Sequence, residues 1–113
     1  MTKTIRSLLV LAAVVCLAGA VGFAQSAGEA TYKAKCQMCH GPNGTPSAGM
    51  AKSMGVKDVS DPDIKKLTAD QMAAAVKNGK GKMKPVAGLT DAQMKDAVNS
   101  YRKFLNPQPL PPG

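Results

Sequence analysis

The segment KCQMCHG, residues 35–41, places two cysteines three positions apart with a histidine directly after the second. Thiols at this spacing lie on one turn of a helix, and the side chain that follows projects close beside them. Cys36, Cys39 and His40 therefore form one local group. A pair of thiols with an adjacent imidazole needs a chemical explanation, and the rest of the chain has to fold around it.

The CxxCH pattern is the attachment motif of a c-type haem. Its two thiols form thioethers with the haem vinyl groups, and the histidine becomes the proximal ligand of the iron. The sequence therefore predicts one covalently bound haem c, with Cys36 and Cys39 as tethers and His40 as an iron ligand. A redox disulfide would leave the histidine unexplained. A structural zinc site takes four ligands, and the expected mature chain offers only these three of the usual Cys and His set.

The first 24 residues have the layout of a secretory signal peptide. Lys3 and Arg6 precede an uncharged apolar stretch, residues 7–23, and small residues surround a cleavage site expected after Ala24. An uncleaved membrane anchor is the alternative, but this stretch is short against the roughly 20 apolar residues that a membrane span needs. We expect export to the periplasm, and Cys16 would leave with the peptide. The domain would then cover residues 25–106, followed by a proline-rich tail, residues 107–113.

The chain is basic, with 15 Lys and Arg against 7 Asp and Glu and a formal net charge of +8. A basic chain can bind nucleic acid, but these charges form no clustered run, and export removes such partners. The mature part has only three aromatic residues, Tyr32, Tyr101 and Phe104, so its own core is small. A large apolar cofactor would supply the burial that the chain lacks.

The remaining pattern predicts an all-α domain. Residues 27–37 read as a helix that ends in the Gly, Pro and Asn residues of 41–44, and residues 45–59 read as a loop with one helical turn at most, near Ala51. Asp61-Pro62 can begin a short helix whose buried side is Ile64 and Leu67.

Two longer helices each begin with a capping box, Thr68 to Gln71 and Thr90 to Gln93. The first helix should end at Asn78-Gly79. Each carries an apolar stripe of helical period. The stripes consist of Ala69, Met72, Ala73 and Val76 in the first helix, and Met94, Ala97, Val98, Tyr101 and Leu105 in the second.

The second axial ligand of the iron must come from elsewhere, because His40 is the chain's one histidine. Methionine, lysine, the terminal amine and water remain, and the soft methionine thioether suits haem iron. Met38 lies between the two cysteines on the proximal side, and we expect it to pack there. Met72 and Met94 belong to apolar helix faces, where methionine usually fills the core.

Met50, Met54 and Met83 are thus the candidates that the residues leave open. Met83 lies in a glycine-rich loop between the two capped helices, next to lysines and just before Pro85, and it has no apolar stripe to join. This placement favours Met83 as the ligand.

The chain resembles the small bacterial class I cytochromes c, which carry one haem with His and Met ligands. Four segments carry the resemblance: Gly28-x-x-x-Tyr32-x-x-x-Cys36, CQMCHG, NGKGKM at residues 78–83, and AVxxYxxxL at residues 97–105. The resemblance implies three to five short helices wrapped around one haem, and it implies Met83 as the distal ligand. It also implies that Gly28 faces Tyr101 where the first and last helices cross. A proline carbonyl, here that of Pro46, would accept a hydrogen bond from the second ring nitrogen of His40.

Together these features lead us to expect a soluble periplasmic electron carrier, not an enzyme. Its partners would be a donor and an acceptor protein with acidic docking faces, steered by Lys35, Lys80, Lys82 and Lys84. One alternative is a haem enzyme, or a gas- or peroxide-binding cytochrome with a labile sixth ligand. Another is a thiol module that holds no haem.

Overall fold

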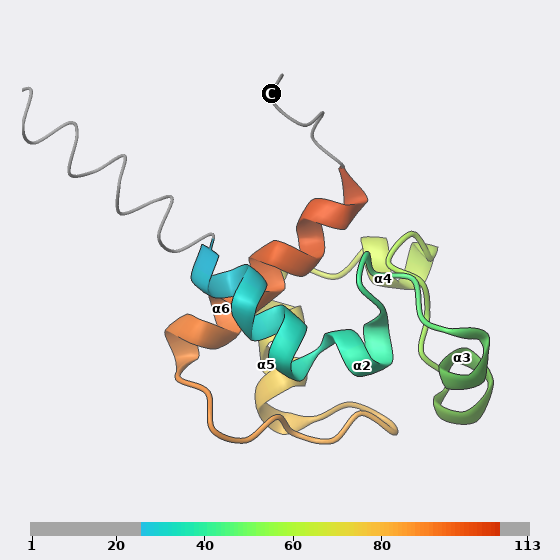
Figure 1. The fold of residues 1–113 in the computed structure, drawn as a ribbon, viewed down its shortest axis with the longest axis horizontal. Coiled ribbons are helices and arrows are strands. Elements are labelled where there is room, and N and C mark those ends of the chain that lie inside the picture. The colour runs from blue at the N-terminus through green and yellow to red at the C-terminus, as the bar shows by residue number, and fades with distance from the viewer. Residues whose placement is uncertain (1–25, 107–113) are drawn as a thin grey trace, which may run out of the picture.

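The computed structural model describes residues 26–106 and is built from helices (Figure 1). A first helix over residues 26–35 is followed by α2 (Gln37–His40), α3 (Ala48–Met54), α4 (Pro62–Lys65), α5 (Ala69–Asn78), α6 (Asp91–Arg102) and a 3-10 helix η1 (Lys103–Leu105). Within residues 26–106 the extended structure amounts to an isolated bridge between Lys80 and Met83. The all-α prediction is confirmed, whereas the expected signal peptide and proline-rich tail lie outside the described residues.

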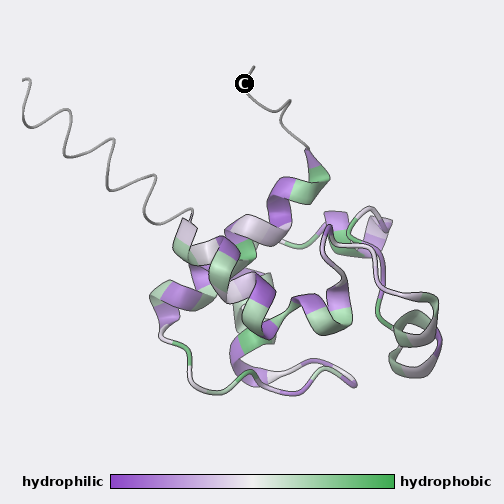
Figure 2. Cartoon of the chain, viewed as in Figure 1, coloured by the Kyte–Doolittle hydropathy of each residue, from purple (hydrophilic) through white to green (hydrophobic). Residues whose placement is uncertain are grey.

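Helices α5 and α6 form the centre of the core. The two capping boxes are confirmed, since each threonine hydroxyl accepts from the backbone amide three residues on and each glutamine side chain bonds back to the cap amide. The buried cluster between the helices consists of Met72, Val76, Met94 and Val98. In Figure 2, α6 carries both hydrophobic and hydrophilic segments, as expected for a helix with one buried face.

The first helix packs against α6 through Gly28, but the predicted facing residue is wrong. A Cβ atom on Gly28 would lie 2.8 Å from the carbonyl carbon of Asp96 and 2.8 Å from the Ser100 hydroxyl oxygen. Tyr101 instead stacks on Tyr32, one turn further along the first helix, with ring centroids 6.1 Å apart. The glycine permits close approach of the two backbones, and the tyrosines pack beside that crossing.

The region expected to be mainly loop contains a seven-residue helix, α3. The Ser47 side chain caps it by accepting from the Met50 amide, and Gly55 ends it in the left-handed conformation at φ 66°. Helix α3 has no buried residue and lies at one end of the molecule in Figure 1. Its cap and its terminal glycine are standard helix signals that the Gly- and Ser-rich composition of the segment obscured.

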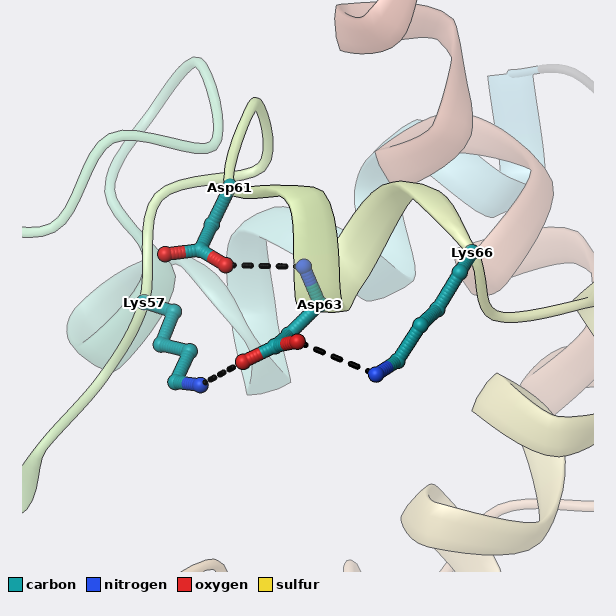
Figure 3. A network of polar contacts seen from close by, with 4 residues as sticks. All are labelled: Lys57, Asp61, Asp63 and Lys66. Atoms are coloured by element: carbon teal, nitrogen blue, oxygen red, sulfur yellow. Dashed lines mark hydrogen bonds and ion pairs between the residues drawn. The ribbon is translucent and has the colours of Figure 1, made fainter.

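Helix α4 begins at Pro62 as predicted, with Asp61 as its N-cap. Asp63 in its first turn pairs with Lys57 at 2.5 Å and with Lys66 at 3.0 Å (Figure 3). These ion pairs are exposed to solvent, and they fasten the loop before α4 to the helix. Ile64 and Leu67 are partly buried and pack against the central cluster.

Candidate haem site

The two cysteines and the histidine lie on one continuous turn that extends the first helix. The Cys36 amide donates to the Tyr32 carbonyl at 2.9 Å, and the Cys36 carbonyl in turn accepts from the amides of Cys39 at 3.2 Å and His40 at 3.0 Å. Both thiols are free and half-buried. Burial, and to a lesser degree the neighbouring Cys39, raises the pKa of the Cys36 thiol. The backbone thus presents two reduced thiols and an imidazole from adjacent positions, as covalent haem attachment requires.

The His40 imidazole is suited to donate a lone pair to a metal. Burial lowers its pKa, which favours the neutral ring. Its Nδ1 atom is buried, and none of the protein groups in residues 26–106 hydrogen bonds to it. The expected acceptor, the Pro46 carbonyl, therefore does not hold this nitrogen. A neutral, partly buried imidazole beside two free thiols is the donor set that a c-type haem needs.

Tyr32 holds the backbone directly after His40. Its hydroxyl is buried and donates to the Gly41 carbonyl at 2.5 Å. Burial also raises the pKa of the Tyr32 hydroxyl, so the donor proton stays in place over the physiological range. Gly41 adopts φ 81° and ψ 165°, a conformation that only glycine adopts readily, and its amide closes α2 on the Gln37 carbonyl.

The side chain of Tyr101 contacts the His40 ring. The two ring centroids are 5.4 Å apart and the ring planes meet at 63°, an edge-to-face arrangement. Tyr101 also packs against the central cluster between α5 and α6. Tyr101 thereby connects the histidine to the main core.

Met38, which was expected to pack near the cysteines, does not. Its side chain is 82% exposed and is the most exposed large hydrophobic residue in the described part of the chain. Helix α2 has no buried residue either. The expectation that Met38 packs there was therefore wrong.

The loop that carries Met83 is a tight hairpin with a defined backbone. The Lys80 amide donates to the Met83 carbonyl at 2.9 Å, and the Met83 amide donates to the Lys80 carbonyl at 3.0 Å. Beyond the turn, the Val86 amide donates to the Val76 carbonyl at 2.9 Å and so joins the loop to α5. Met83 is half-buried and packs against the central cluster. Its neighbours Lys82 and Lys84 are exposed, so Met83 is the half-buried side chain of this turn.

The other two candidate ligands lie on α3. Met50 is half-buried and Met54 is 38% exposed, and neither belongs to the central cluster. The Lys82 ammonium donates to the Ser53 carbonyl at 3.2 Å and links the Met83 loop to α3. Of the three methionines left open by the sequence, Met83 alone is held by both the core and a hydrogen-bonded turn.

The apolar side chains around this core fit a large apolar group. None of the described side chains is completely buried. Several apolar residues that line the central cluster are only partly covered: Ile64, Leu67, Met83, Val86, Leu89 and Tyr101. Within residues 26–106, no three His, Cys, Asp or Glu side chains converge as a site for a bare metal ion. The donor set and the partly covered apolar rim therefore match a porphyrin better than a simple ion.

The comparisons with known proteins agree with this chemistry. Residues 23–99 match the family described as cytochrome C oxidase, cbb3-type, subunit III. A solved structure described as KustC0563 c-type cytochrome is similar over 68% of this chain and 95% of its own length, with 25% identity and a TM-score of 0.60. No curated protein matches the chain.

Proposed function

The chain belongs to the cytochrome c family described as cytochrome C oxidase, cbb3-type, subunit III, and we propose that it is a periplasmic one-electron carrier with a His- and Met-ligated haem. Membership of this family implies a covalently bound haem c with iron and a role in electron transfer to and from partner proteins.

Cys36 and Cys39 would form the two thioethers, and His40 would bind the iron from the proximal side. The observation that carries this assignment is the single hydrogen-bonded turn that presents both free thiols and the imidazole. Tyr32 supports it by fixing the Gly41 carbonyl, which follows the histidine. Attachment to adjacent positions of one turn also limits how far the group can move relative to the chain.

Met83 would bind the iron from the distal side. Its support is the hairpin closed by Lys80, the hydrogen bond from Val86 to α5, and the packing of Met83 on the central cluster. These contacts define the position of the thioether before it meets a metal, so less conformational entropy is lost on binding. Bound haem supplies an iron that changes oxidation state by one electron, and a methionine ligand raises its reduction potential.

Protein ligands on both sides would leave no open coordination position for a substrate. The protein part then has three tasks: to bury the ring, to hold His40 and Met83 in place in both oxidation states, and to leave an edge accessible to partners. This is why we propose a carrier and not an enzyme.

Four exposed lysines support a docking surface for acidic partners: Lys35, Lys80, Lys82 and Lys84. Lys35 adjoins the attachment turn, and the other three surround Met83 in the hairpin. Positive charge near the proposed ligands would steer diffusion of an acidic protein toward them. Among residues 26–106 no helix is both long and apolar enough to cross a bilayer. The periplasmic location rests on the predicted signal peptide, which lies outside those residues.

The experiment that tests the proposed function is an optical spectrum of the purified protein, recorded oxidised, reduced, and reduced under carbon monoxide. A carrier gives a low-spin spectrum, a methionine-to-iron charge-transfer band when oxidised, and no change on addition of carbon monoxide. A high-spin ferric spectrum or ready carbon monoxide binding would instead identify a cytochrome with a labile sixth ligand. Haem staining after denaturing electrophoresis checks covalent attachment, and a Cys36→Ser, Cys39→Ser variant should lose the stain.

A further inference from the structure

We propose that packing against the ring of Tyr101 positions the imidazole of the proximal histidine. The inference rests on the proposed role of His40 as iron ligand. It adds a residue on α6, far from the attachment motif in the sequence, that sets the plane of the imidazole.

The contact between the two rings is direct. Their centroids are 5.4 Å apart with the planes at 63°, within the range of favourable edge-to-face aromatic pairs. Rotation of the imidazole about its Cβ–Cγ bond would lose this contact or drive the ring into Tyr101. The tyrosine ring therefore restricts the orientation of the imidazole plane.

The usual means of fixing this ring is not present among the described residues. Ligating histidines generally donate their second N–H to a carbonyl, a carboxylate or water, and this bond fixes the ring orientation. Here the buried Nδ1 has no hydrogen-bond partner among the protein groups of residues 26–106. The Gly41 carbonyl, which follows the histidine, already accepts from the Tyr32 hydroxyl. Packing against Tyr101 is an orienting contact that the described residues do provide.

Tyr101 is itself held in place by several contacts, so its ring can restrict rotation of the imidazole. It stacks on Tyr32 at 6.1 Å, and Phe104 packs edge-on against it at 6.4 Å. It also packs against the buried cluster of α5 and α6. Tyr32 therefore holds the backbone that follows His40, and Tyr101, which stacks on Tyr32, holds the imidazole ring. The contact with His40 is made by the ring of Tyr101, so a phenylalanine should serve equally well.

The orientation of the axial imidazole plane contributes to how unpaired spin is distributed over a ferric haem. Proton NMR of the oxidised holoprotein measures this through the shifts of the four haem methyl groups. We expect Tyr101→Phe to keep the wild-type methyl pattern and Tyr101→Leu to change the order or spread of the methyl shifts. Phe104→Leu is the matched control, since it removes another ring of the same aromatic cluster but leaves Tyr101 stacked on Tyr32, and it should change the pattern much less than Tyr101→Leu.

Three results would overturn the inference: an unchanged pattern in Tyr101→Leu, an equal change in Tyr101→Phe, or an equal change in Phe104→Leu. If Tyr101→Leu does not fold, a nuclear Overhauser effect between the Tyr101 and His40 ring protons in reduced wild type decides, and its absence counts against the contact. A wild-type protein without a low-spin His/Met spectrum would overturn the proposed function as well, so failures of the two proposals are distinguishable.

Discussion

Gly41 and Gly79 shape the two loops that adjoin the proposed ligands. Gly41 follows His40 with φ 81° and ψ 165°, and Gly79 precedes the Met83 hairpin with φ 80° and ψ 164°. This region of backbone conformation is accessible almost only to glycine. The sequence suggested turns at both places, but the pattern alone could not say that the backbone approaches itself so closely there.

A substitution at Gly79 should therefore disturb the ligand loop. A Cβ atom there would lie 2.8 Å from the Met83 carbonyl oxygen and 2.9 Å from Cδ of Pro85. We expect Gly79→Ala to lower the free energy of unfolding by about 1–3 kcal/mol and to weaken the charge-transfer band. Urea unfolding and the optical spectrum measure the two effects.

Gly81→Ala is the matched control in the same loop. Gly81 also has a positive φ, 58°, but nothing lies within 4 Å of an added Cβ atom. Gly81→Ala should lower the free energy of unfolding only by the roughly 1–2 kcal/mol that an alanine needs to adopt a left-handed backbone conformation. The charge-transfer band should be retained. If Gly79→Ala and Gly81→Ala weakened the charge-transfer band equally, the close packing of Gly79 against the Met83 carbonyl and Pro85 would not be what holds Met83.

At the scale of elements, the crossing of the first helix with α6 links the attachment turn to the core. Gly28 sits against Asp96 and Ser100, and the buried Ser100 is 5% exposed. Ser100 was not identified from the sequence, because a single serine on a helix carries no signal of the helix that crosses it. The crossing also brings Tyr32 beside Tyr101.

We expect Gly28→Ala to destabilise the protein by about 1–3 kcal/mol, since the added methyl group would overlap the α6 backbone. Gly49→Ala, on α3, is the control. Nothing lies within 4 Å of a Cβ atom at that position, so the substitution should stabilise α3 by about 0.5–1 kcal/mol. Denaturant unfolding of both variants checks the pair, and a neutral Gly28→Ala would contradict the described crossing.

The ion pairs at α4 predict a pH dependence. Hydrogen bonds from Lys57 and Lys66 lower the pKa of Asp63 from 3.8 to about 2. A carboxylate with a depressed pKa stabilises the folded state above its unfolded pKa, and this contribution is lost as the pH falls through the folded value. Wild type should therefore lose more stability than Asp63→Asn between pH 5 and pH 2.

The effect at Asp63 should be small, because both ion pairs are exposed to solvent. Asp70→Asn is a control on the neighbouring helix, since Asp70 forms no ion pair within the described residues. Its acid profile should follow wild type. Parallel profiles for wild type and Asp63→Asn would mean that the network in Figure 3 does not persist in solution.

The elements differ in how well their sequence patterns predict them. Helices α5 and α6 were predictable because a capping box, an apolar stripe and a terminal signal agree in each. Helix α3 was not, because its seven residues include Gly49 and no residue of it is buried.

Contacts between elements were harder to predict than the elements. The pairing of Gly28 with Tyr101 was wrong because the register between two crossing helices depends on their angle and distance, which neither helix encodes alone. The burial of Val59 in a loop was missed for a similar reason, since Val59 packs beside Gly44 only after the chain turns back.

At the scale of the whole molecule, the attachment turn, the Met83 hairpin and the α5–α6 core meet through few residues. Tyr101 touches both His40 and the core, and Met83 packs on that same core. CxxCH could be assigned from sequence because it is local. The contacts that connect it to the Met83 loop could not be assigned, since they depend on side chains more than 40 residues apart.

The excess of positive charge gives a prediction for partner binding. Electron transfer to an acidic redox protein should slow as ionic strength rises, because salt at about 0.1 M screens charges beyond about 10 Å. Lys84→Glu, next to Met83, should slow the reaction severalfold at low salt. Lys95→Glu makes the same charge change on the exposed face of α6 and should have a weaker effect. Rates that do not change with salt would contradict steering by the hairpin lysines.

The central claim is that the haem iron lies between His40 and Met83, and the most direct test is the oxidised optical spectrum and reduction potential of Met83→Ala. Met50→Ala is the control, because Met50 is the half-buried methionine of α3 and was a competing candidate. The account predicts that Met83→Ala loses the methionine-to-iron charge-transfer band and has a lower potential, while Met50→Ala retains both properties. A Met83→Ala protein that keeps the band, or a Met50→Ala protein that loses it, would contradict the assignment.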